Sequence, residues 1–562
     1  MEKIKDVMPL VESWLKEPYR EEFRNELKVL IENKNYDELY DRFYKSLEFG
    51  TGGMRGIMGA GTNRMNIYTV AAATKGLSDY LKKMKKNRVV VSYDTRNNSQ
   101  VFSEIVVKVL SNLGIKTFYF SKPYPTPFLS FMTRKLNAIG VMITASHNPP
   151  EYNGYKVFWD NGVQVLPPHD INIVNTIKKV KIYDVVSLID SPIDYKYAED
   201  ITEKFDDEYI NTIMSFIDIS KIDKDTKVLY TPLYGTGRDL MKKLMSRLSI
   251  NLDLVEEEAV FDGNFPGINV PNLEEPKVFK LALKKASEYS NKYDIIIGTD
   301  PDADRLGVWV KHNNDYIFLN GNQIGTIMLY YLLSNRNYKK NSYCITTIVS
   351  SDIIEPIAKE FNVKFYKTLT GFKYIGDLIM KKKSGFIFGY EESFGYLIGD
   401  YIGDKDGISA AGLLSEIVSY IKSKKMSLYE YLESIYSKYG YYYESLRSFN
   451  LPFDKQKKIM NILRGSKDNL AGYKIKKKID LNKKGFKALF SKDIYSSLPK
   501  SDVLMFYLEP SFKVAVRPSG TEPKIKFYFA INHVKDKNIY DLRKCIEEFE
   551  NIVLNYVKEV VS

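Results

Sequence analysis

Cysteine is scarce in this sequence: Cys344 and Cys545 are the only two among 562 residues. Two cysteines so far apart provide neither a disulfide framework nor a cysteine-based zinc motif. The sequence also lacks an uninterrupted apolar run near the roughly 18 residues that a membrane-spanning helix needs. Residues 1–19 contain no continuous apolar signal-peptide core. These absences predict a protein of the reducing cytoplasm with no membrane partner.

Dense clusters of basic residues are missing as well, although the formal net charge is +12. Nucleic-acid binding would require lysines and arginines gathered on one element with aromatic residues among them. Here the basic residues are spread along the chain, in short runs such as residues 381–383 and 476–478. We interpret these runs as solvated surface and expect no nucleic-acid partner. The positive charge is still compatible with an anionic small molecule.

A repeated pattern organises most of the chain. Three times, an apolar strand leads through a loop and a helix to a second apolar strand, which ends in a polar loop. The first strands are predicted at residues 88–93, 227–230 and 343–349. The second strands are predicted at residues 138–143, 294–297 and 385–388, and the loops that follow read TASHNP, GTDPDADR and GYEESFGY. Such alternation predicts mainly parallel sheets covered by helices, with ligand sites beyond the carboxyl ends of the strands.

The C-terminal part follows a different pattern. Strand-like segments precede and follow RPSGTEPK, and a long amphipathic helix is predicted over residues 540–560. We therefore predict three similar α/β domains with mixed or parallel sheets and a fourth α+β domain, arranged around a central cleft. The predicted domains are residues 1–205, 206–320, 321–440 and 441–562.

Three aspartates alternate after the strand at 294–297: Asp300, Asp302 and Asp304. In an extended chain they face the same way, and three carboxylates on one face repel each other unless a cation lies among them. Hard oxygen ligands favour Mg²⁺ or Ca²⁺. An EF-hand is excluded, because Arg305 stands where that loop needs glycine. A polar loop without metal is the alternative.

The loop TASHNP contains Ser146, which on its own is as compatible with a turn as with a nucleophile. The flanking residues do not form the G-x-S-x-G elbow of a hydrolase. His147 is adjacent and could assist electrostatically. Downstream, Asn153-Gly154 predicts a tight turn that brings Lys156 beside the serine, where a lysine can take part in proton transfer.

Two further motifs suit a phosphorylated sugar. RPSGTEPK offers a guanidinium, two hydroxyls and a glycine for binding a phosphate dianion, through Arg517, Ser519, Gly520 and Thr521. GYEESFGY offers Glu391 and Ser393 to sugar hydroxyls, although an ordinary helix start is the alternative. Thr370-Gly371 is a weaker candidate that simple turn chemistry also explains.

Taken together, these motifs resemble those of the α-D-phosphohexomutase superfamily, which includes phosphoglucomutases, phosphomannomutases and phosphopentomutases. TASHNP with NGYK is similar to the family's phosphoserine loop, and GTDPDADR to its magnesium loop. TGFK and GYEESFGY resemble its sugar-recognition loops, and RPSGTEPK its phosphate-binding loop. The resemblance covers nearly the whole chain and implies three similar α/β domains with a smaller fourth one.

The resemblance also implies a mechanism. Phosphorylated Ser146 would donate its phosphoryl group to the substrate, giving a sugar 1,6-bisphosphate that also serves as activator. One Mg²⁺ per chain would be held by a phosphoserine oxygen and the three aspartates. The resemblance places Arg55 near the phosphoserine, and Lys156 and Lys405 in proton transfer with His147 in support. Glu391 and Ser393 would contact sugar hydroxyls, with Thr370 and Gly371 as further substrate-binding residues, and Arg305 would bind substrate directly after the metal loop. The phosphate that is not being transferred would be held by Arg517, Ser519, Gly520 and Thr521.

The segment LEFGTGGMRGIMGAGTNRMN is most similar to the branch of bacterial phosphoglucomutases and phosphoglucomutase-2-like enzymes. It favours interconversion of glucose 1-phosphate and glucose 6-phosphate, with mannose phosphate and pentose phosphate as alternative substrates. A phosphatase is an alternative of another class. A monomer is the family-level expectation for the assembly, with a dimer as the alternative.

Overall fold

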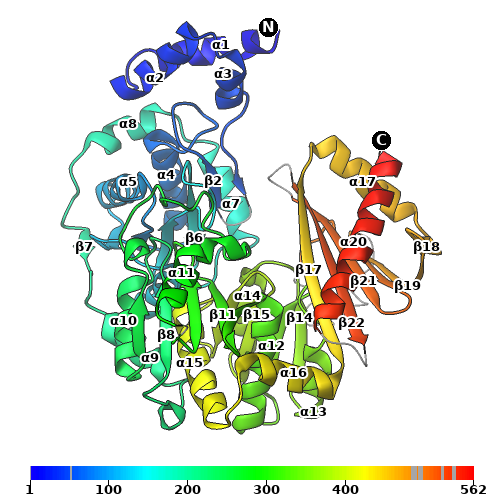
Figure 1. Cartoon of the computed structure of the whole chain (residues 1–562). Helices are drawn as coiled ribbons and strands as arrows, with labels where there is room; N and C mark the ends of the chain where they lie inside the picture. The colour runs from blue at the N-terminus through cyan, green and yellow to red at the C-terminus, as the bar shows by residue number, and fades with distance from the viewer. Residues whose placement is uncertain are drawn as a thin grey trace. The chain divides into compact units, whose positions relative to one another are not determined.

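The structure is a computed structural model that describes residues 2–50, 53–290, 292–482, 490, 498–519, 524–534 and 539–561. The chain divides into two compact units, residues 1–307 with 401–416 and residues 308–400 with 417–562. Among the described residues there are four sheets, of seven, five, four and six strands. The predicted fold class of three α/β domains and a fourth α+β domain is confirmed (Figure 1).

The first helices of the chain are rich in charged residues: α1 Glu2–Trp14, α2 Glu21–Glu32 and α3 Tyr36–Phe43. The seven-stranded sheet that follows has the order β1-β2-β6-β5-β3-β4-β7. Its strands are β1 Phe49–Gly50, β2 Gly53–Ile57, β3 Arg88–Tyr93, β4 Lys116–Tyr119, β5 Ile139–Ile143, β6 Tyr152–Phe158 and β7 Ala198–Asp200. The accompanying helices are α4 Ile67–Lys83, α5 Ser99–Asn112, α6 Thr126–Leu136, α7 His169–Ile177 and α8 Tyr183–Asp190.

Strand β3 lies in the parallel centre of this sheet, between β4 and β5. Its apolar residues Val89 and Val91 belong to one buried core with Val106 and Leu110 of α5. Beyond β5 the sheet turns antiparallel, because β6 pairs with both β5 and β2. The parallel strands therefore end at one edge, where the chain leaves β5 and returns through β6.

The tight turn predicted at Asn153-Gly154 is wrong, because both residues lie within β6. Gly154 serves a different purpose there. A Cβ atom at this position would lie 2.4 Å from the carbonyl oxygen of Thr144 and 2.9 Å from that of Met54. Glycine thus allows the backbone just before Ser146 to approach β6 closely, and Lys156 follows two residues later on the same strand.

The second domain contains the parallel strands β9, β8 and β10, with β8 paired to both neighbours. Its elements are α9 Asp206–Met214, β8 Lys227–Thr231, α10 Arg238–Arg247, β9 Asn251–Leu254, α11 Lys280–Glu288 and β10 Ile295–Thr299. The chain continues into β11 Leu306–His312, within which the division between the units falls. Strand β12 Asp315–Leu319 pairs antiparallel with β11.

The third domain has the sheet order β14-β13-β15-β16. Strand β13 is parallel to β14 and β15, and β16 closes an antiparallel hairpin with β15. The elements are α12 Gly321–Asn335, β13 Tyr343–Thr347, α13 Ile354–Glu360, β14 Lys364–Thr368, α14 Phe372–Lys382, β15 Phe386–Glu391, β16 Gly395–Ile398, α15 Gly407–Ser423 and α16 Leu428–Tyr439. The helix start considered for GYEESFGY is wrong, because the motif forms the turn of this hairpin.

The fourth domain is an antiparallel sheet with the order β17-β22-β21-β20-β19-β18. Its elements are β17 Tyr441–Asn450, α17 Phe453–Gly465, β18 Asn469–Leu470, β19 Tyr473–Asp480, β20 Leu504–Leu508, β21 Phe512–Pro518, β22 Lys524–Val534 and α20 Ile539–Val561. Phe549 of the C-terminal helix stacks on Phe512 with ring centroids 4.3 Å apart, within a separate apolar core.

Among the described helices, none combines the length and the apolar character needed to cross a bilayer.

Candidate active site

Ser146 lies in the turn between β5 and β6 and is almost completely buried. Its φ angle is +51°, a left-handed backbone conformation that a residue with a side chain adopts at some cost. The Ser146 amide donates to Thr144 Oγ1 (2.7 Å), and its hydroxyl donates to Asp300 Oδ2 (2.8 Å). The serine oxygen is therefore aimed at the aspartate loop of the second domain.

The backbone of this turn is held by a buried arginine. Arg96 donates to the carbonyl oxygens of Ser146 and Asn148 with one terminal nitrogen, and to that of Pro149 (2.8 Å) with the other. Asp94 lies 3.3 Å from Arg96 Nε, and both side chains are fully buried. One guanidinium thus fixes several carbonyls of a strained turn, which supports its conformation.

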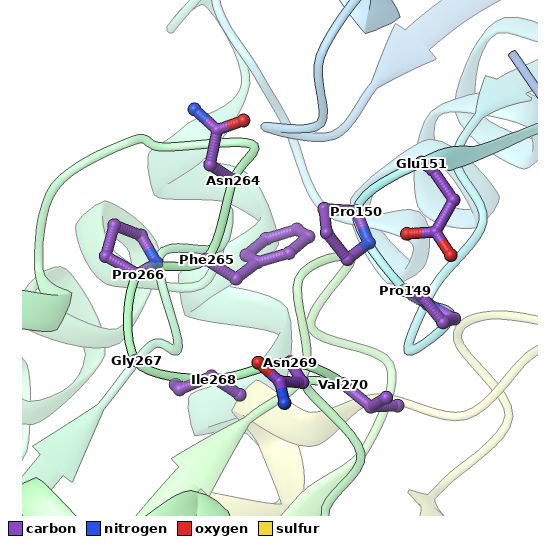
Figure 2. A pocket seen from close by; sticks show the side chains of 10 residues that line it. All are labelled: Pro149, Pro150, Glu151, Asn264, Phe265, Pro266, Gly267, Ile268, Asn269 and Val270. Carbon is purple, nitrogen blue, oxygen red and sulfur yellow. The ribbon is translucent and has the colours of Figure 1, made fainter.

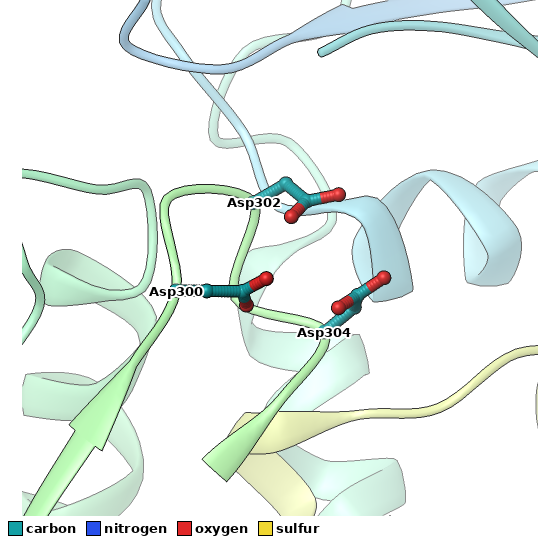
Figure 3. A group of neighbouring side chains, drawn as sticks. All are labelled: Asp300, Asp302 and Asp304. Carbon is teal, nitrogen blue, oxygen red and sulfur yellow. The ribbon is translucent and has the colours of Figure 1, made fainter. Parts of the chain in front are cut away.

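The three predicted metal-binding aspartates come together. Asp300, Asp302 and Asp304 are buried, and each offers one carboxylate oxygen within 4.8 Å of the others. Figure 3 shows the three carboxylates directed toward a common space. Asp302 Oδ1 and Asp304 Oδ1 are buried and have no hydrogen-bond partner among the described residues. Buried carboxylate oxygens without a hydrogen-bond partner suit a hard cation, so the donor set fits a divalent metal ion.

Two lysines contact this cluster. Lys156 Nζ lies 2.9 Å from Asp302 Oδ2, and Lys405 Nζ lies 2.8 Å from Asp304 Oδ2. Thr126, at the start of α6, donates to the same oxygen of Asp302 (2.8 Å). Both lysines named as candidates for proton transfer therefore lie against the acidic loop.

The pKa values of two aspartates move in opposite directions. Burial raises the pKa of Asp300 well above its ordinary value, and the charges of Asp304 and Asp302 add to the rise. Burial also acts to raise the pKa of Asp302, but Lys156 and Lys405 outweigh it and hold the pKa below the ordinary value. Such divergence within one cluster is typical of functional sites.

The other predicted residues of this unit lie close by. Arg55, on β2, donates to Asn148 Oδ1 (2.9 Å), and His147 Nδ1 lies 3.3 Å from Ser146 Oγ. The guanidinium of Arg305 lies 3.2 Å from Glu274, while its backbone amide donates to Asp300 Oδ1 (3.2 Å). Arg305 therefore holds the aspartate loop through its main chain.

The second unit brings the predicted sugar-binding loops together. Gly371, with φ +116°, donates its amide to Glu391 Oε1 (2.7 Å). The Thr370 hydroxyl is buried and has no hydrogen-bond partner among the described residues. Ser393 lies in the β15–β16 turn, two residues after Glu391. A hydrogen bond thus joins the loop of Gly371 to the loop of Glu391, about twenty residues later in the chain. The buried hydroxyl of Thr370 belongs to the residue next to Gly371.

The predicted phosphate-binding loop follows β21. Arg517 lies on this strand, opposite Lys526 of β22. The Ser519 amide donates to the carbonyl oxygen of Lys524 (2.7 Å), which closes the base of the loop. Gly520 and Thr521 lie outside the described residues. Arg517 and Ser519 are therefore placed at the end of a hairpin, as expected for a loop between strands.

Three side chains at the first site were missed as functional candidates: Asp94, Arg96 and Thr126. The DTR that contains Asp94 and Arg96 does follow the predicted strand β3, and a charged pair directly after a buried strand was the available signal. Thr126 carried no signal, because its contact with Asp302 joins positions 176 residues apart.

The sequence matches one protein family in three segments. Residues 46–184, 207–313 and 320–439 match, in this order, domains I, II and III of the phosphoglucomutase/phosphomannomutase family, each described as an alpha/beta/alpha domain. The matched segments contain the Ser146 loop, the three aspartates and the Glu391 loop. The matches therefore cover these three loops, whereas the loop after β21 lies outside the matched segments.

Individual proteins give the same result. A phosphoglucomutase of Staphylococcus haemolyticus (strain JCSC1435) is 34% identical over 505 residues, which cover 87% of this chain and 91% of the relative. A putative phosphomannomutase of Thermus thermophilus has a TM-score of 0.69 at 21% identity, covering 91% and 99%. The Paramecium phosphoglucomutase pp63/parafusin, in an open form, has a TM-score of 0.68 at 16% identity, covering 92% and 95%. At these identities the two solved structures support the fold.

Proposed function

Because the chain belongs to the phosphoglucomutase/phosphomannomutase family of the α-D-phosphohexomutase superfamily, whose members are mutases of the isomerase class, we propose that it interconverts glucose 1-phosphate and glucose 6-phosphate. The observation that carries the proposal is the 2.8 Å contact between Ser146 Oγ and Asp300 in a buried carboxylate cluster. A serine placed against a cation site is suited to carrying a phosphoryl group.

In the proposed cycle, a hydroxyl oxygen of the sugar attacks the phosphorus of phosphorylated Ser146. A new P–O bond forms to the sugar, and the bond from phosphorus to Ser146 Oγ breaks. The resulting sugar 1,6-bisphosphate turns around, and its other phosphoryl group is transferred to Ser146. The enzyme thereby returns to its phosphorylated state, and no water is consumed.

Proton transfer must accompany each phosphoryl transfer. The attacking hydroxyl loses a proton and the leaving serine oxygen gains one. Lys156 and Lys405 are our candidates, since both ammonium groups lie within 3 Å of the cluster that faces Ser146. His147, with Nδ1 3.3 Å from Ser146 Oγ, is a supporting candidate. Each can hold a proton near an oxygen on which negative charge develops.

We propose that the three aspartates, together with an oxygen of phosphorylated Ser146, hold one Mg²⁺ per chain. The donor set consists of hard carboxylate oxygens, two of which are buried and have no hydrogen-bond partner among the described residues. When bound, a divalent ion of this kind neutralises negative charge that builds up around a transferring phosphoryl group.

The substrate is proposed to bind through the loops of the second unit and Arg305. Glu391 and Ser393, with Thr370 and Gly371 beside them, would contact sugar hydroxyls, because carboxylates and hydroxyls pair well with such groups. The loop comprising Arg517, Ser519, Gly520 and Thr521 would bind the phosphate that is not being transferred. All the residues proposed to contact the substrate belong to one chain, so the proposal requires no partner subunit.

We also propose a cytoplasmic location. Among the described residues, Cys344 and Cys545 are free thiols, which suits a reducing compartment.

A coupled assay tests the function. Glucose 1-phosphate is supplied with Mg²⁺ and catalytic sugar 1,6-bisphosphate, and the formation of glucose 6-phosphate is followed. We expect activity in the wild type and its loss in Ser146→Ala. The control variant is Ser423→Ala, which changes an exposed serine at the end of α15 and should be as active as the wild type if the protein preparations are comparable.

Normal turnover by Ser146→Ala would refute the phosphoserine mechanism. Faster turnover of mannose 1-phosphate or a pentose 1-phosphate would transfer the same mechanism to one of the alternative substrates. Release of inorganic phosphate without isomerisation would instead indicate a phosphatase.

A further inference from the structure

A loop of the second domain packs behind the turn that carries Ser146. Residues 264–270 of this loop line a cavity of about 440 Å³, whose other wall is formed by Pro149, Pro150 and Glu151. These three residues form the last part of the turn that carries Ser146, and Figure 2 shows the ring of Phe265 directed toward Pro150. The loop at 262–270 can therefore influence the Ser146 turn, although none of its residues is one of the reacting groups.

Phe265 makes the most specific contact from this loop. Its ring centroid lies 5.0 Å from the guanidinium carbon of Arg96, the side chain that holds the carbonyl oxygens of Ser146 and Asn148. Phe265 is almost completely buried, although it lies in a loop and not in a strand of the second domain's sheet. An aromatic face over a buried guanidinium is favourable, and it keeps water away from the N–H groups.

The backbone of the loop is adapted to this contact. Phe265 has a φ angle of +48°, which is unusual for a bulky residue. At Gly263, a Cβ atom would lie 2.2 Å from the backbone nitrogen of Asn97, so only glycine permits this approach. Asn97 Nδ2 donates to Asn264 Oδ1 (2.8 Å). A strained phenylalanine directly after two such attachments indicates that its position is required.

We propose that Phe265 is a positioning residue for phosphoryl transfer and that it acts on Ser146 through Arg96. The ring shields the guanidinium from water, so that its N–H groups remain available to the carbonyls of the strained turn. Without the ring, water competes for these donors, and the turn relaxes away from the aspartate cluster. This inference rests on the proposed function, since it assumes that Ser146 carries the phosphoryl group.

The test compares Phe265→Leu with a matched control in the same segment. Phe261 also lies over a guanidinium, that of Arg238, at 4.3 Å. Among the described residues, no contact joins that pair to the Ser146 turn. Phe261→Leu therefore removes the same kind of contact elsewhere, from a ring that is 38% exposed where Phe265 is 1% exposed. Phe265→Met is a second variant in case Phe265→Leu does not fold, and Phe265→Tyr retains the aromatic face.

Five quantities are measured on the full chain. They are turnover and KM for glucose 1-phosphate, the phosphoryl occupancy of Ser146 by intact-protein mass spectrometry, the lifetime of that phosphoryl group in water, and the ³¹P chemical shift of the phosphoserine. Because small displacements of a reacting group cost about ten- to a hundredfold in rate, we expect turnover to fall by about that factor in Phe265→Leu. We expect little change in KM, a shorter phosphoryl lifetime and a shifted ³¹P resonance of the phosphoserine. Phe265→Tyr should restore most of the rate, and Phe261→Leu should resemble the wild type.

Wild-type turnover and phosphoryl lifetime in Phe265→Leu, or in Phe265→Met, would overturn the inference. Equal losses in Phe265→Leu and Phe261→Leu would overturn it as well, because the effect would then be one of general stability. Failure of the proposed function is a separate observation. In that case the wild type itself would carry no phosphoryl group on Ser146 after incubation with sugar 1,6-bisphosphate.

Discussion

Glu258 is a buried carboxyl group close to the loop that contains Phe265, and it makes the stability of the second domain dependent on pH. Its side chain is only 1% exposed, and it accepts a hydrogen bond from Thr231 at the end of β8. Burial raises the pKa of Glu258 from 4.5 to about 7, with a contribution from the neighbouring charge of Glu257. The substitution Glu258→Gln keeps the shape and an acceptor oxygen but removes the ionisation.

The sign of the effect follows from the direction of the pKa change. Because the folded pKa of Glu258 lies above the unfolded one, its contribution to stability is complete below pH 4.5 and is lost as the pH rises through 7. Each pKa unit corresponds to about 1.36 kcal/mol, so the full loss above pH 8 is about 3 kcal/mol. Between pH 5.5 and pH 8 the loss grows by about 2 kcal/mol. We therefore expect Glu258→Gln to gain about that much stability relative to the wild type over this interval.

Native-state hydrogen exchange is the suitable assay, because a chain of several domains does not unfold in one step. The opening free energy of amides in β8, Lys227–Thr231, is compared between wild type and Glu258→Gln at the two pH values after correction for intrinsic exchange. Glu256→Gln, at an exposed neighbour, serves as control: it keeps Glu258, so its opening free energy should fall with rising pH as that of the wild type does. The reasoning would be refuted if the difference in opening free energy between Glu258→Gln and the wild type stayed constant or decreased as the pH rose.

Two further predictions concern other buried carboxylates. Burial and the adjacent aspartates raise the pKa of Asp300, so its ionisation destabilises the metal-free protein as the pH rises. In chelator at pH 8, Asp300→Asn should therefore unfold at a higher temperature than the wild type. In the presence of Mg²⁺ the same variant should have lost its activity. A lower melting temperature would contradict this. In the second unit, Lys367 and Lys513 lie 2.7 and 3.1 Å from the carboxylate of Asp352. Asp352→Asn leaves both ammonium groups buried without that charge and should cost about 3–5 kcal/mol in urea unfolding of the second unit, whereas a cost below about 1 kcal/mol would count against the argument.

Elements whose determining signal is local could be predicted from the sequence. The strands β3, β5, β8, β10 and β13 are short apolar runs bounded by polar loops, and the structure contains all of them within one or two residues of the predicted positions. Ser427 and Glu430, spaced as S-x-x-E in the sequence, form a capping box at the start of α16. Both features are determined by neighbouring residues, which is why periodicity and capping rules suffice.

Antiparallel partners were harder to predict. The sequence of β6 favours a turn, because Asn153-Gly154 is a typical turn sequence. What decides its structure is pairing with β5 and β2, which lie on both sides of it in the sheet. Gly154 is then needed for close approach between strands, and its freedom to turn is not used. Glycine can meet either need, and a single sequence does not distinguish them.

The support of Ser146 could not be predicted for a more general reason. Its contacts join distant positions: Arg96 acts across 50 residues, and Phe265 reaches Arg96 across 169. Arg96 alone looks like a surface charge, and Phe265 alone looks like a core residue. Only the path of the chain shows that the phenylalanine covers the arginine and that the arginine holds the serine turn. A motif thus identifies the group that reacts, while the residues that hold it in place follow from the fold and must be tested separately.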